Sequence, residues 1–242
     1  MRRALRGILA AFGVILAMTA LLLAAQEMST ESAYHDLGER GGDLVDKGEV
    51  AKRNWDQILD ENGEAVGWIT VEETPIDYPV VQPTHPTQND FYLSHNFWRQ
   101  ADVAGCPYLD TRTNIAGTHM MIFGHRLGST NRMFGSLSSA WKQKAFESLG
   151  VAHLETPDGD AVFSPFCALK VDCGFSDIQR FDFDTDEDME SWLSKLLLRS
   201  SAHHAEAESL VTRANRALTL VTCTGPRIGG RERTLTVFVS CT

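Results

Sequence analysis

Short runs of apolar residues, separated by turn residues, make up much of the chain after its first third. The segment 61–83 carries β-branched and aromatic residues on both sides of a Thr74-Pro75 corner, which predicts two short strands. The segment 151–173 is typical of a β-hairpin with Asp158-Gly159 at its tip. Further apolar runs predict strands at 105–110, 119–125, 217–223 and 234–240.

Helical spacing of apolar residues is less frequent. In 184–200 apolar residues recur at helical spacing, acidic residues open the segment, and Lys195 and Arg199 lie near its end, as a helix dipole favours. The segments 133–150 and 28–60 are also helix-forming, and Gly41-Gly42 interrupts the second. Many short strands with few helices between them predict a mostly β fold with flanking helices, either a barrel or a sandwich.

The N-terminal segment has a composition of its own. Arginines at positions 2, 3 and 6 precede an uncharged run at 7–25, close to the roughly 20 residues that a helix needs to cross a bilayer. Basic residues before the run and acidic ones after it place the N-terminus inside and the bulk of the chain outside. A cleaved signal peptide is the alternative, but its apolar region is usually only about 7–15 residues long. We expect an anchor at 1–26, a stalk and helical extension at 27–62, and one globular domain at 63–242.

Charge and cysteine content narrow the class of protein. The chain has 22 basic and 32 acidic residues, so without the three arginines of the anchor it carries a net charge of −13, which argues against a nucleic-acid partner. The five cysteines are an odd number and too few for a disulfide scaffold. Neither a CxxC pair nor a zinc-type spacing occurs, and the acidic "FDFDTDEDME" lacks the glycine of a calcium loop. We therefore predict neither a metal nor another cofactor.

Three features could together form a reactive site. Cys223 ends the predicted strand "ALTLVTC", where it is a buried thiol, half of a disulfide, a metal ligand or a nucleophile. His125 ends another apolar strand, and Arg227, Arg231 and Arg233 follow the cysteine. A thiolate attacks carbonyl carbons, a histidine moves the proton, and an arginine stabilises the oxyanion that develops in acyl transfer. Each feature alone has a structural explanation, but the combination suits acyl transfer.

The chain resembles class B sortases from Gly67 to the C-terminus. The resemblance rests on "VGWITVEETPIDYPVVQ", "NDFYLSHNFWRQADVAGCPYLD", "MIFGHRLGSTNRMFGSL" and "LTLVTCTG" followed by "RERTLTVFV", in this order, and on the long helix-bearing insert 174–216 before the cysteine strand. It implies an eight-stranded sortase-type β-barrel with N-terminal helices. It also implies a membrane-anchored cysteine transpeptidase, single-pass, with its catalytic domain, 63–242, outside the cell.

The resemblance implies roles for particular residues. Cys223 corresponds to the nucleophile, His125 to the general acid/base and Arg233 to the oxyanion and substrate-binding residue. Substrate contacts are implied for three residues beside the nucleophile: Val221, Thr222 and Thr224. The implied substrates are secreted proteins with a C-terminal sorting motif, of the Asn-Pro-x-Thr type, cleaved after threonine, and the acceptor is an amine of cell-wall peptide or of a pilin.

This chain departs from the family pattern at several positions. Val221 stands where members often have serine, and Arg126 where asparagine commonly follows the histidine. Extra residues separate Arg233 from the final valine run, so Arg231 is a competing candidate for its role. Two other functions stay open: a hydrolytic cysteine peptidase, in which water resolves the same acyl-enzyme, and an inactive membrane-tethered binding module on a sortase scaffold.

Overall fold

A computed structural model describes residues 2–39, 53–84, 90–128, 130–225 and 230–241. Eight of its strands close into a mixed barrel in the order β5-β1-β2-β3-β4-β8-β9-β6, and the pairing of β5 with β6 completes the ring. The bounds of these strands are β1 (Ala65–Val71), β2 (Ile76–Val81), β3 (Tyr108–Leu109), β4 (His119–Phe123), β5 (Ala152–Thr156), β6 (Gly159–Asp172), β8 (Ala214–Cys223) and β9 (Glu232–Cys241). The predicted eight-stranded barrel is therefore confirmed. A ninth strand, β7 (Ala202–His203), pairs only with β6.

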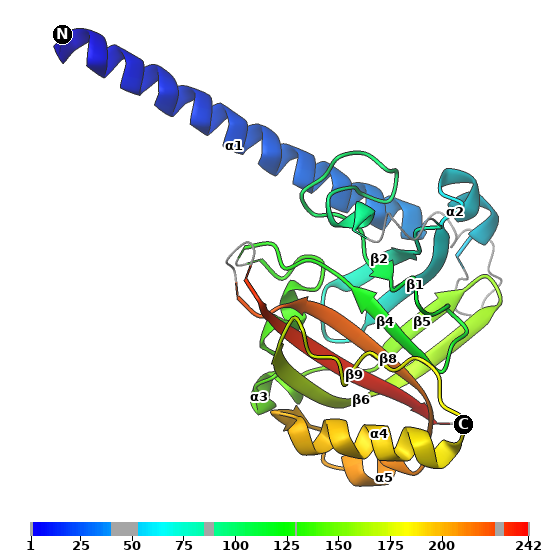
Figure 1. Ribbon diagram of the computed structural model, residues 1–242. Coiled ribbons are helices and arrows are strands. Elements are labelled where there is room, and N and C mark those ends of the chain that lie inside the picture. The colour runs from blue at the N-terminus through cyan, green and yellow to red at the C-terminus, as the bar shows by residue number, and fades with distance from the viewer. Residues whose placement is uncertain (1, 40–52, 85–89, 129, 226–229, 242) are drawn as a thin grey trace.

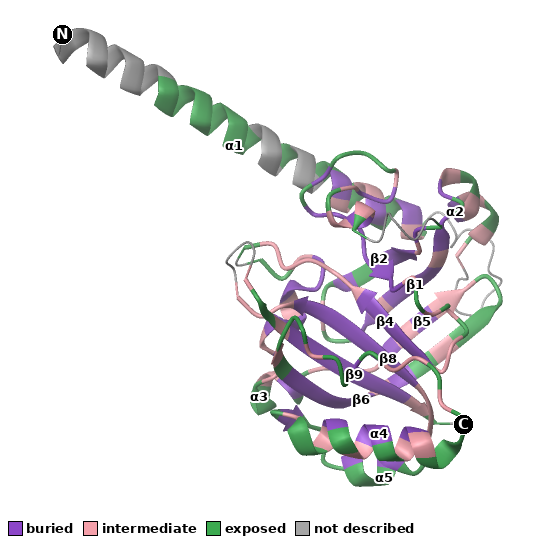
Figure 2. Cartoon of the chain, viewed as in Figure 1, coloured by how far each residue is buried: buried purple, intermediate pink, exposed green. Residues whose placement is uncertain are grey.

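Alternation along the strands creates two apolar layers. In β8, Leu218 and Leu220 point into the cluster inside the barrel, whereas Ala217 and Val221 belong to a second cluster on the outer face. Successive side chains of a strand face opposite sides of a sheet, so a strand buried on both faces reads as a continuous apolar run. This is why the "ALTLVT" part of β8 is buried along its length (Figure 2). Its two threonines, Thr219 and Thr222, are buried as well.

The insert before β8 covers the outer face of the barrel. Its helix α4 (Asp186–Arg199) begins after Thr185, whose hydroxyl accepts a hydrogen bond from the amide of Asp188, and buries Met189, Trp192 and Leu193 against the sheet. The short helix α5 (Ala207–Val211) lies beside it (Figure 1). The helix predicted at 184–200 is confirmed.

The helical prediction for 133–150 holds only in part. That segment forms a 3-10 helix, η4 (Gly135–Ser139), and a single-turn helix, α3 (Gln143–Phe146). Apart from Leu137, η4 consists of glycine and serine. Both disfavour an α-helix interior, glycine through backbone entropy and serine through competing hydrogen bonds. Gly135 also has no room for a side chain, since a Cβ there would lie 2.3 Å from the carbonyl oxygen of Thr130.

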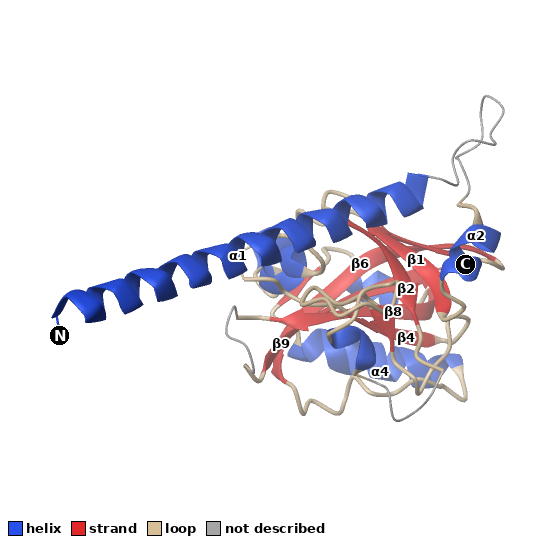
Figure 3. Ribbon diagram, turned by 90° about the horizontal axis from the view of Figure 1, so that it is seen from above, coloured by secondary structure: helices blue, strands red, loops and turns tan. Residues whose placement is uncertain are grey.

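The N-terminal region reaches the barrel through two helices. Helix α1 (Arg2–Glu39) runs away from the barrel along most of its length, and its C-terminal end packs beside β2 (Figures 1 and 3). Helix α2 (Trp55–Glu61) is capped by Asn54 and buries Ile58. The predicted break at Gly41-Gly42 lies outside the described residues. Within the described part of the chain no helix has the length and apolarity to span a membrane, so the predicted transmembrane anchor at 1–26 is not confirmed.

Candidate active site

The strand register places Cys223 directly opposite Arg233. These residues are the last aligned pair of the antiparallel strands β8 and β9, after Val221 with Leu235 and Thr222 with Thr234. Directly opposed residues of an antiparallel pair project on the same face of the sheet, about 4.5–5.5 Å apart at Cβ. Cys223 therefore shares the outer face with Val221 and Leu235, the face that the insert covers.

His125 comes to the same end of the sheet from β4. Strands β4 and β8 run parallel, Phe123 pairs with Val221, and the amide of Gly124 donates to the carbonyl of Val221 over 3.0 Å. Continued for two residues, this register sets His125 level with Cys223 and on the same face. The structure thus brings the predicted cysteine, histidine and one of the predicted arginines to one edge of the barrel.

A backbone carbonyl selects the tautomer of His125. Its Nε2 lies 2.7 Å from the carbonyl oxygen of Leu93, and a carbonyl oxygen only accepts, so Nε2 carries a proton. In the neutral ring Nδ1 is then the nitrogen that can accept a proton. The backbone of His125 is held too, because its carbonyl accepts from the amide of Phe134 over 3.0 Å. We identify Leu93 as a site residue that sequence reasoning missed, since a backbone carbonyl leaves no mark in the choice of side chain.

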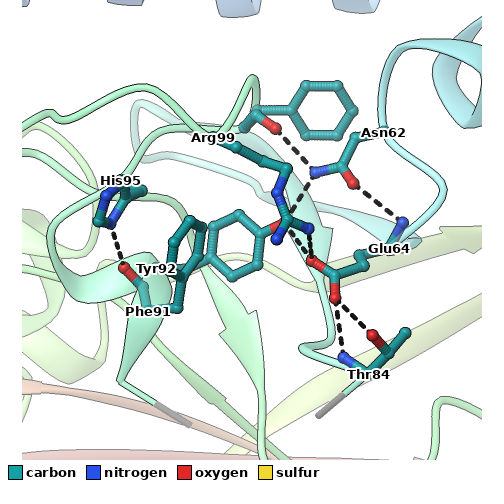
Figure 4. A network of polar contacts seen from close by, with 8 residues as sticks. Asn62, Glu64, Thr84, Phe91, Tyr92, His95 and Arg99 are labelled. Atoms are coloured by element: carbon teal, nitrogen blue, oxygen red, sulfur yellow. Dashed lines mark hydrogen bonds and ion pairs between the residues drawn. The ribbon is translucent and has the colours of Figure 1, made fainter. Parts of the chain in front are cut away.

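The turn that presents Leu93 rests on a buried polar network. This turn is the 3-10 helix η3 (Phe91–Leu93), and the hydroxyl of its Tyr92 donates to Glu64 over 2.7 Å (Figure 4). Asn62 donates to the same hydroxyl over 2.9 Å and to the carbonyl of Phe97 over 2.7 Å. The network ties the turn beneath His125 to the start of the barrel.

Glu64 is the charged centre of that network. Its carboxylate also accepts from the amide and hydroxyl of Thr84 and forms an ion pair with Arg99 (Figure 4). Burial opposes ionisation, but these hydrogen bonds and the Arg99 charge prevail and lower the pKa of Glu64 below its usual value. The carboxylate is therefore ionised at neutral pH and satisfied by its donors.

The two described arginines after Cys223 have different partners. Arg231 is exposed and makes a bidentate pair with Asp172, over 2.9 and 2.7 Å. Arg233 is half-buried and donates to two backbone carbonyls, that of Gly230 over 2.6 Å and that of Glu232 over 3.2 Å. Arg231 is thus occupied by a carboxylate, whereas Arg233 meets no carboxylate among the described residues. Arg227 lies outside the described residues.

The residues that flank Cys223 differ in accessibility. Thr222 is 1% exposed, faces the barrel interior, and its hydroxyl has no hydrogen-bond partner in the described part of the chain. Val221 is 4% exposed, on the outer face. The half-buried Thr224 shares a hydrogen bond of 3.0 Å with Thr234. In this structure Thr224 is the most accessible of the three residues for which substrate contact was predicted.

Cys223 is less buried than two of the other cysteines. Cys106 and Cys167 are fully buried, and burial raises the pKa of both thiols, so both stay protonated. Cys223 is half-buried, Cys173 and Cys241 are exposed, and all five thiols are free. Thiols react as thiolates, so Cys106 and Cys167 are poor nucleophiles.

The other histidines near the site have structural partners. His119 is buried, its Nδ1 donates to the carbonyl of Arg180 over 2.6 Å, and its Nε2 accepts from the hydroxyl of Thr219 over 2.8 Å. His95 stacks on Phe91 with ring centroids 3.9 Å apart. Among the described residues no group of histidine, cysteine and carboxylate side chains could hold a metal ion.

Solved structures share this fold. The Staphylococcus aureus sortase B–substrate complex superposes with a TM-score of 0.74 over 89% of this chain and 97% of that one, at 24% identity. Sortase B from B. anthracis superposes with a TM-score of 0.73 over 92% and 99% of the two chains, at 22% identity. The closed mixed barrel with its flanking helices is therefore the sortase fold.

Sequence relatives specify the class within that fold. The chain is 27% identical over 201 residues to sortase B of Staphylococcus aureus, which covers 82% of this chain and 79% of the relative. It is 29% identical over 168 residues to sortase B of Listeria monocytogenes, which covers 67% and 63% of the two chains. No protein-family model matches it. The chain is a homologue of class B sortases, and these relatives indicate an enzyme, a cysteine transpeptidase.

Proposed function

We propose that the chain cleaves a C-terminal sorting motif after its threonine and transfers the new acyl group to an amine. Cys223 gives its proton to Nδ1 of His125, and its sulfur attacks the threonine carbonyl carbon. The C–N bond then breaks, and the imidazolium returns the proton to the leaving amine. A thioacyl-enzyme remains, until an amine attacks the same carbon, the C–S bond breaks and a proton from the amine goes back to the thiolate through His125.

The observation that carries this proposal is the pairing of Cys223 with Arg233 beside His125. The register puts a cation on the face from which the thiol projects, where negative charge develops on the carbonyl oxygen. The carbonyl of Leu93 leaves Nδ1 of His125 to exchange the proton. In this proposal the nucleophile and the oxyanion donor lie on β8 and β9, and the proton carrier follows the end of β4 by two residues.

The finer assignments rest on the relatives. A sortase B–substrate complex has the same fold, which supports a secreted sorting-motif protein as substrate here, with the Asn-Pro-x-Thr type as our expectation. The peptide would lie beside Cys223 against the insert. The amine would come from cell-wall peptide or from a pilin. Residues 63–242 would form the catalytic domain.

Attachment to the cell membrane through the N-terminal segment is part of the same proposal. It is supported by the uncharged run 7–25 and by the exposed apolar side chains of α1, among them Phe12, Ile15 and Leu16. Sedimentation with phospholipid vesicles of the full chain, but not of a chain that begins at residue 27, is the expected result. Equal sedimentation of both would refute this attachment.

The test is mass spectrometry of the products from a library of sorting-motif peptides. We expect a thioacyl adduct on Cys223, a ligated product when an amine is added, and neither in Cys223→Ala. Cleavage that ignores added amine would make the chain a hydrolytic peptidase. Peptide binding without any adduct or cleavage would make it a binding module.

A further inference from the structure

A groove of about 550 Å³ lies between α4 and α5 and takes no part in the proposed reaction. Val211 of α5 lines it shortly before β8 begins at Ala214, whereas Cys223 ends that strand. Roughly 30 Å of extended chain therefore separates this part of the groove from the thiol. Both helices lie on the side of the barrel opposite α1 (Figure 1). The groove thus opens on a surface that neither the active site nor the N-terminal helix uses.

The base of the groove is apolar, and an exposed leucine borders it. Val211 is only 7% exposed and Leu197 of α4 is half-buried, whereas Leu198, which also lines the groove, is 87% exposed. Single exposed leucines are common on protein surfaces. A leucine that continues an apolar groove into solvent, however, extends the apolar surface that a partner can cover. A small ligand within the groove would leave most of Leu198 in water, whereas a longer partner would bury it.

The charges along the groove are of one sign. Glu190 of α4 and Glu208 of α5 line it from the two sides, and no basic residue does so among the described residues. Neither carboxylate has an ion-pair or hydrogen-bond partner in the described part of the chain. Arg199, at the end of α4, pairs instead with Asp177. Two carboxylates that the chain leaves unneutralised create a negative potential, which favours a cationic partner.

The walls of the groove are held in place without a partner. At His203, β7 pairs with β6, and the side chain of Gln143 donates to the carbonyl of His203 over 2.9 Å and accepts from its amide over 3.0 Å. On the other side, the part of α4 from Glu190 to Leu198 covers roughly 12 Å, or about two turns. A preformed groove lowers the entropic cost of binding. Two helices that flank such a groove can receive two turns of a third helix.

We propose that this groove docks a short amphipathic helix of a partner protein, with leucine-type side chains along one stripe and lysine or arginine on both flanks of that stripe. The apolar stripe covers Leu197 and Leu198 and reaches Val211. The basic side chains pair with Glu190 on one side and Glu208 on the other. Because the groove is remote from Cys223, this docking does not depend on the proposed transpeptidation.

The experiment titrates the full chain with a fluorescein-labelled helical peptide of leucine and lysine at helical spacing, followed by fluorescence anisotropy. We expect Leu198→Ala to raise the Kd about tenfold, because it removes an apolar anchor. Replacing both carboxylates, Glu190→Gln with Glu208→Gln, should raise it about fivefold, the effect of two partly exposed ion pairs. The matched control is Asp184→Asn with Glu187→Gln, which changes the net charge equally at exposed residues outside the groove. It should change the Kd less than about twofold.

Thermal unfolding controls for stability, which should stay unchanged in Leu198→Ala because that side chain is already in water. Unchanged peptide binding in both groove variants would overturn the proposal, and so would equal binding of a twin peptide with glutamate in place of lysine. An equal loss in the control variant would show a general attraction of a basic peptide to an acidic chain. Binding of dodecylamine but not of the peptide would make the groove a small-molecule site. Every outcome is read from binding, so a failure of the proposed function, seen as the lack of an acyl-enzyme, leaves this test intact.

Discussion

The choice between Arg231 and Arg233 depends on a difference of two residues at the start of β9. They are an even number of residues apart, so side-chain alternation in the sequence could not separate them. The register separates them, because Arg233 is opposite Cys223 and Arg231 is held by Asp172. A step of two residues, roughly 6.6 Å, is more than an oxyanion contact tolerates.

We therefore expect Arg233→Ala to lower kcat/KM by about 10²–10³, the usual effect of losing an oxyanion donor. Arg231→Ala should lower it less than about threefold, because an exposed ion pair contributes little. Steady-state kinetics with one sorting peptide measure both, and thermal unfolding of each variant controls for stability. The reverse order of the two effects, at equal stability, would move the role to Arg231.

Because His119 is buried, we expect it to make the stability of the fold, rather than catalysis, depend on pH. Burial lowers its pKa to about 4, although its hydrogen bond to Arg180 works in the other direction. The unfolded chain has a histidine pKa of about 6.5, so between pH 6.5 and 4 it binds more protons than the folded chain. The stability from this residue is complete above about pH 6.5 and is lost as the pH falls toward 4.

We expect the free energy of unfolding to fall by up to about 3 kcal/mol over that window because of this histidine. His119→Gln should flatten that part of the curve, at some cost in stability at pH 7, because Gln cannot reproduce both hydrogen bonds. Chemical denaturation at pH 7, 6, 5 and 4 measures it. An equally steep curve in the variant would show that another group titrates there.

Several features of the site could be inferred from residues, and others could not. Cys223 and His125 stand at the ends of apolar runs, and the ends of neighbouring strands meet at one edge of a sheet. The inward direction of Thr222 follows from alternation only once the faces of β8 are known. The contact of the Leu93 carbonyl with His125 and the pairing of Asp172 with Arg231 are long-range contacts, which leave no local pattern in the sequence.

At the scale of elements, one side chain connects the two parallel strands of the site. Arg126, the residue after His125, donates through its guanidinium to the backbone carbonyl of Thr224, the residue after Cys223. It therefore holds the end of β4 level with the end of β8. The family resemblance marked this arginine as a departure from asparagine, and the structure gives it a contact.

We expect Arg126→Ala to lower kcat about tenfold with little change in KM. The substitution would loosen the spacing of His125 and Cys223 but would not remove a contact with the bound peptide. Arg126→Lys should restore part of the rate. The matched control is Arg216→Ala, since Arg216 donates to the carbonyls of Gly117 and Ile115 far from Cys223 on β8. That variant should change stability but not kcat. Equal kcat losses in the two alanine variants would show that Arg126 acts through stability alone.

Strands were easier to foresee than the short helices. Each strand of the barrel has its own apolar run, and the 152–172 hairpin has its Asp-Gly tip. The prediction of one helix over 133–150 was only partly right, because the composition of this segment is compatible with a helix. Close packing at Gly135 and the serines of η4 break it into short turns. Local propensity is a weak prior there, and tertiary contacts decide the outcome.

At the scale of the whole molecule, the C-terminal part of α1 is integrated into the barrel. The hydroxyl of Tyr34 donates to the carbonyl of Gly105 over 3.1 Å and accepts from the amide of Phe97 over 3.1 Å. Its ring stacks on Trp98 at 5.4 Å between centroids and meets Tyr78 edge-on at 5.7 Å. The sequence predicted a stalk with a docked helix in this region, but not that one tyrosine would join three segments of the domain.

We expect Tyr34→Ala to lower the free energy of unfolding by about 3–5 kcal/mol, the usual cost of removing a buried aromatic side chain. Tyr34→Phe keeps the ring but leaves the amide of Phe97 without its partner, and should cost about 1–3 kcal/mol. Asp36→Ala, on the exposed side of the same helix, is the matched control and should stay within about 0.5 kcal/mol of the parent. Urea denaturation followed by tryptophan fluorescence measures all three.

Gly105 also packs against the His125 ring, since a Cβ added at Gly105 would lie only 3.3 Å from that ring. Undocking of α1 should therefore lower activity together with stability. If Tyr34→Ala were as stable as Asp36→Ala, the helix would be a tether beside the domain and not part of its core.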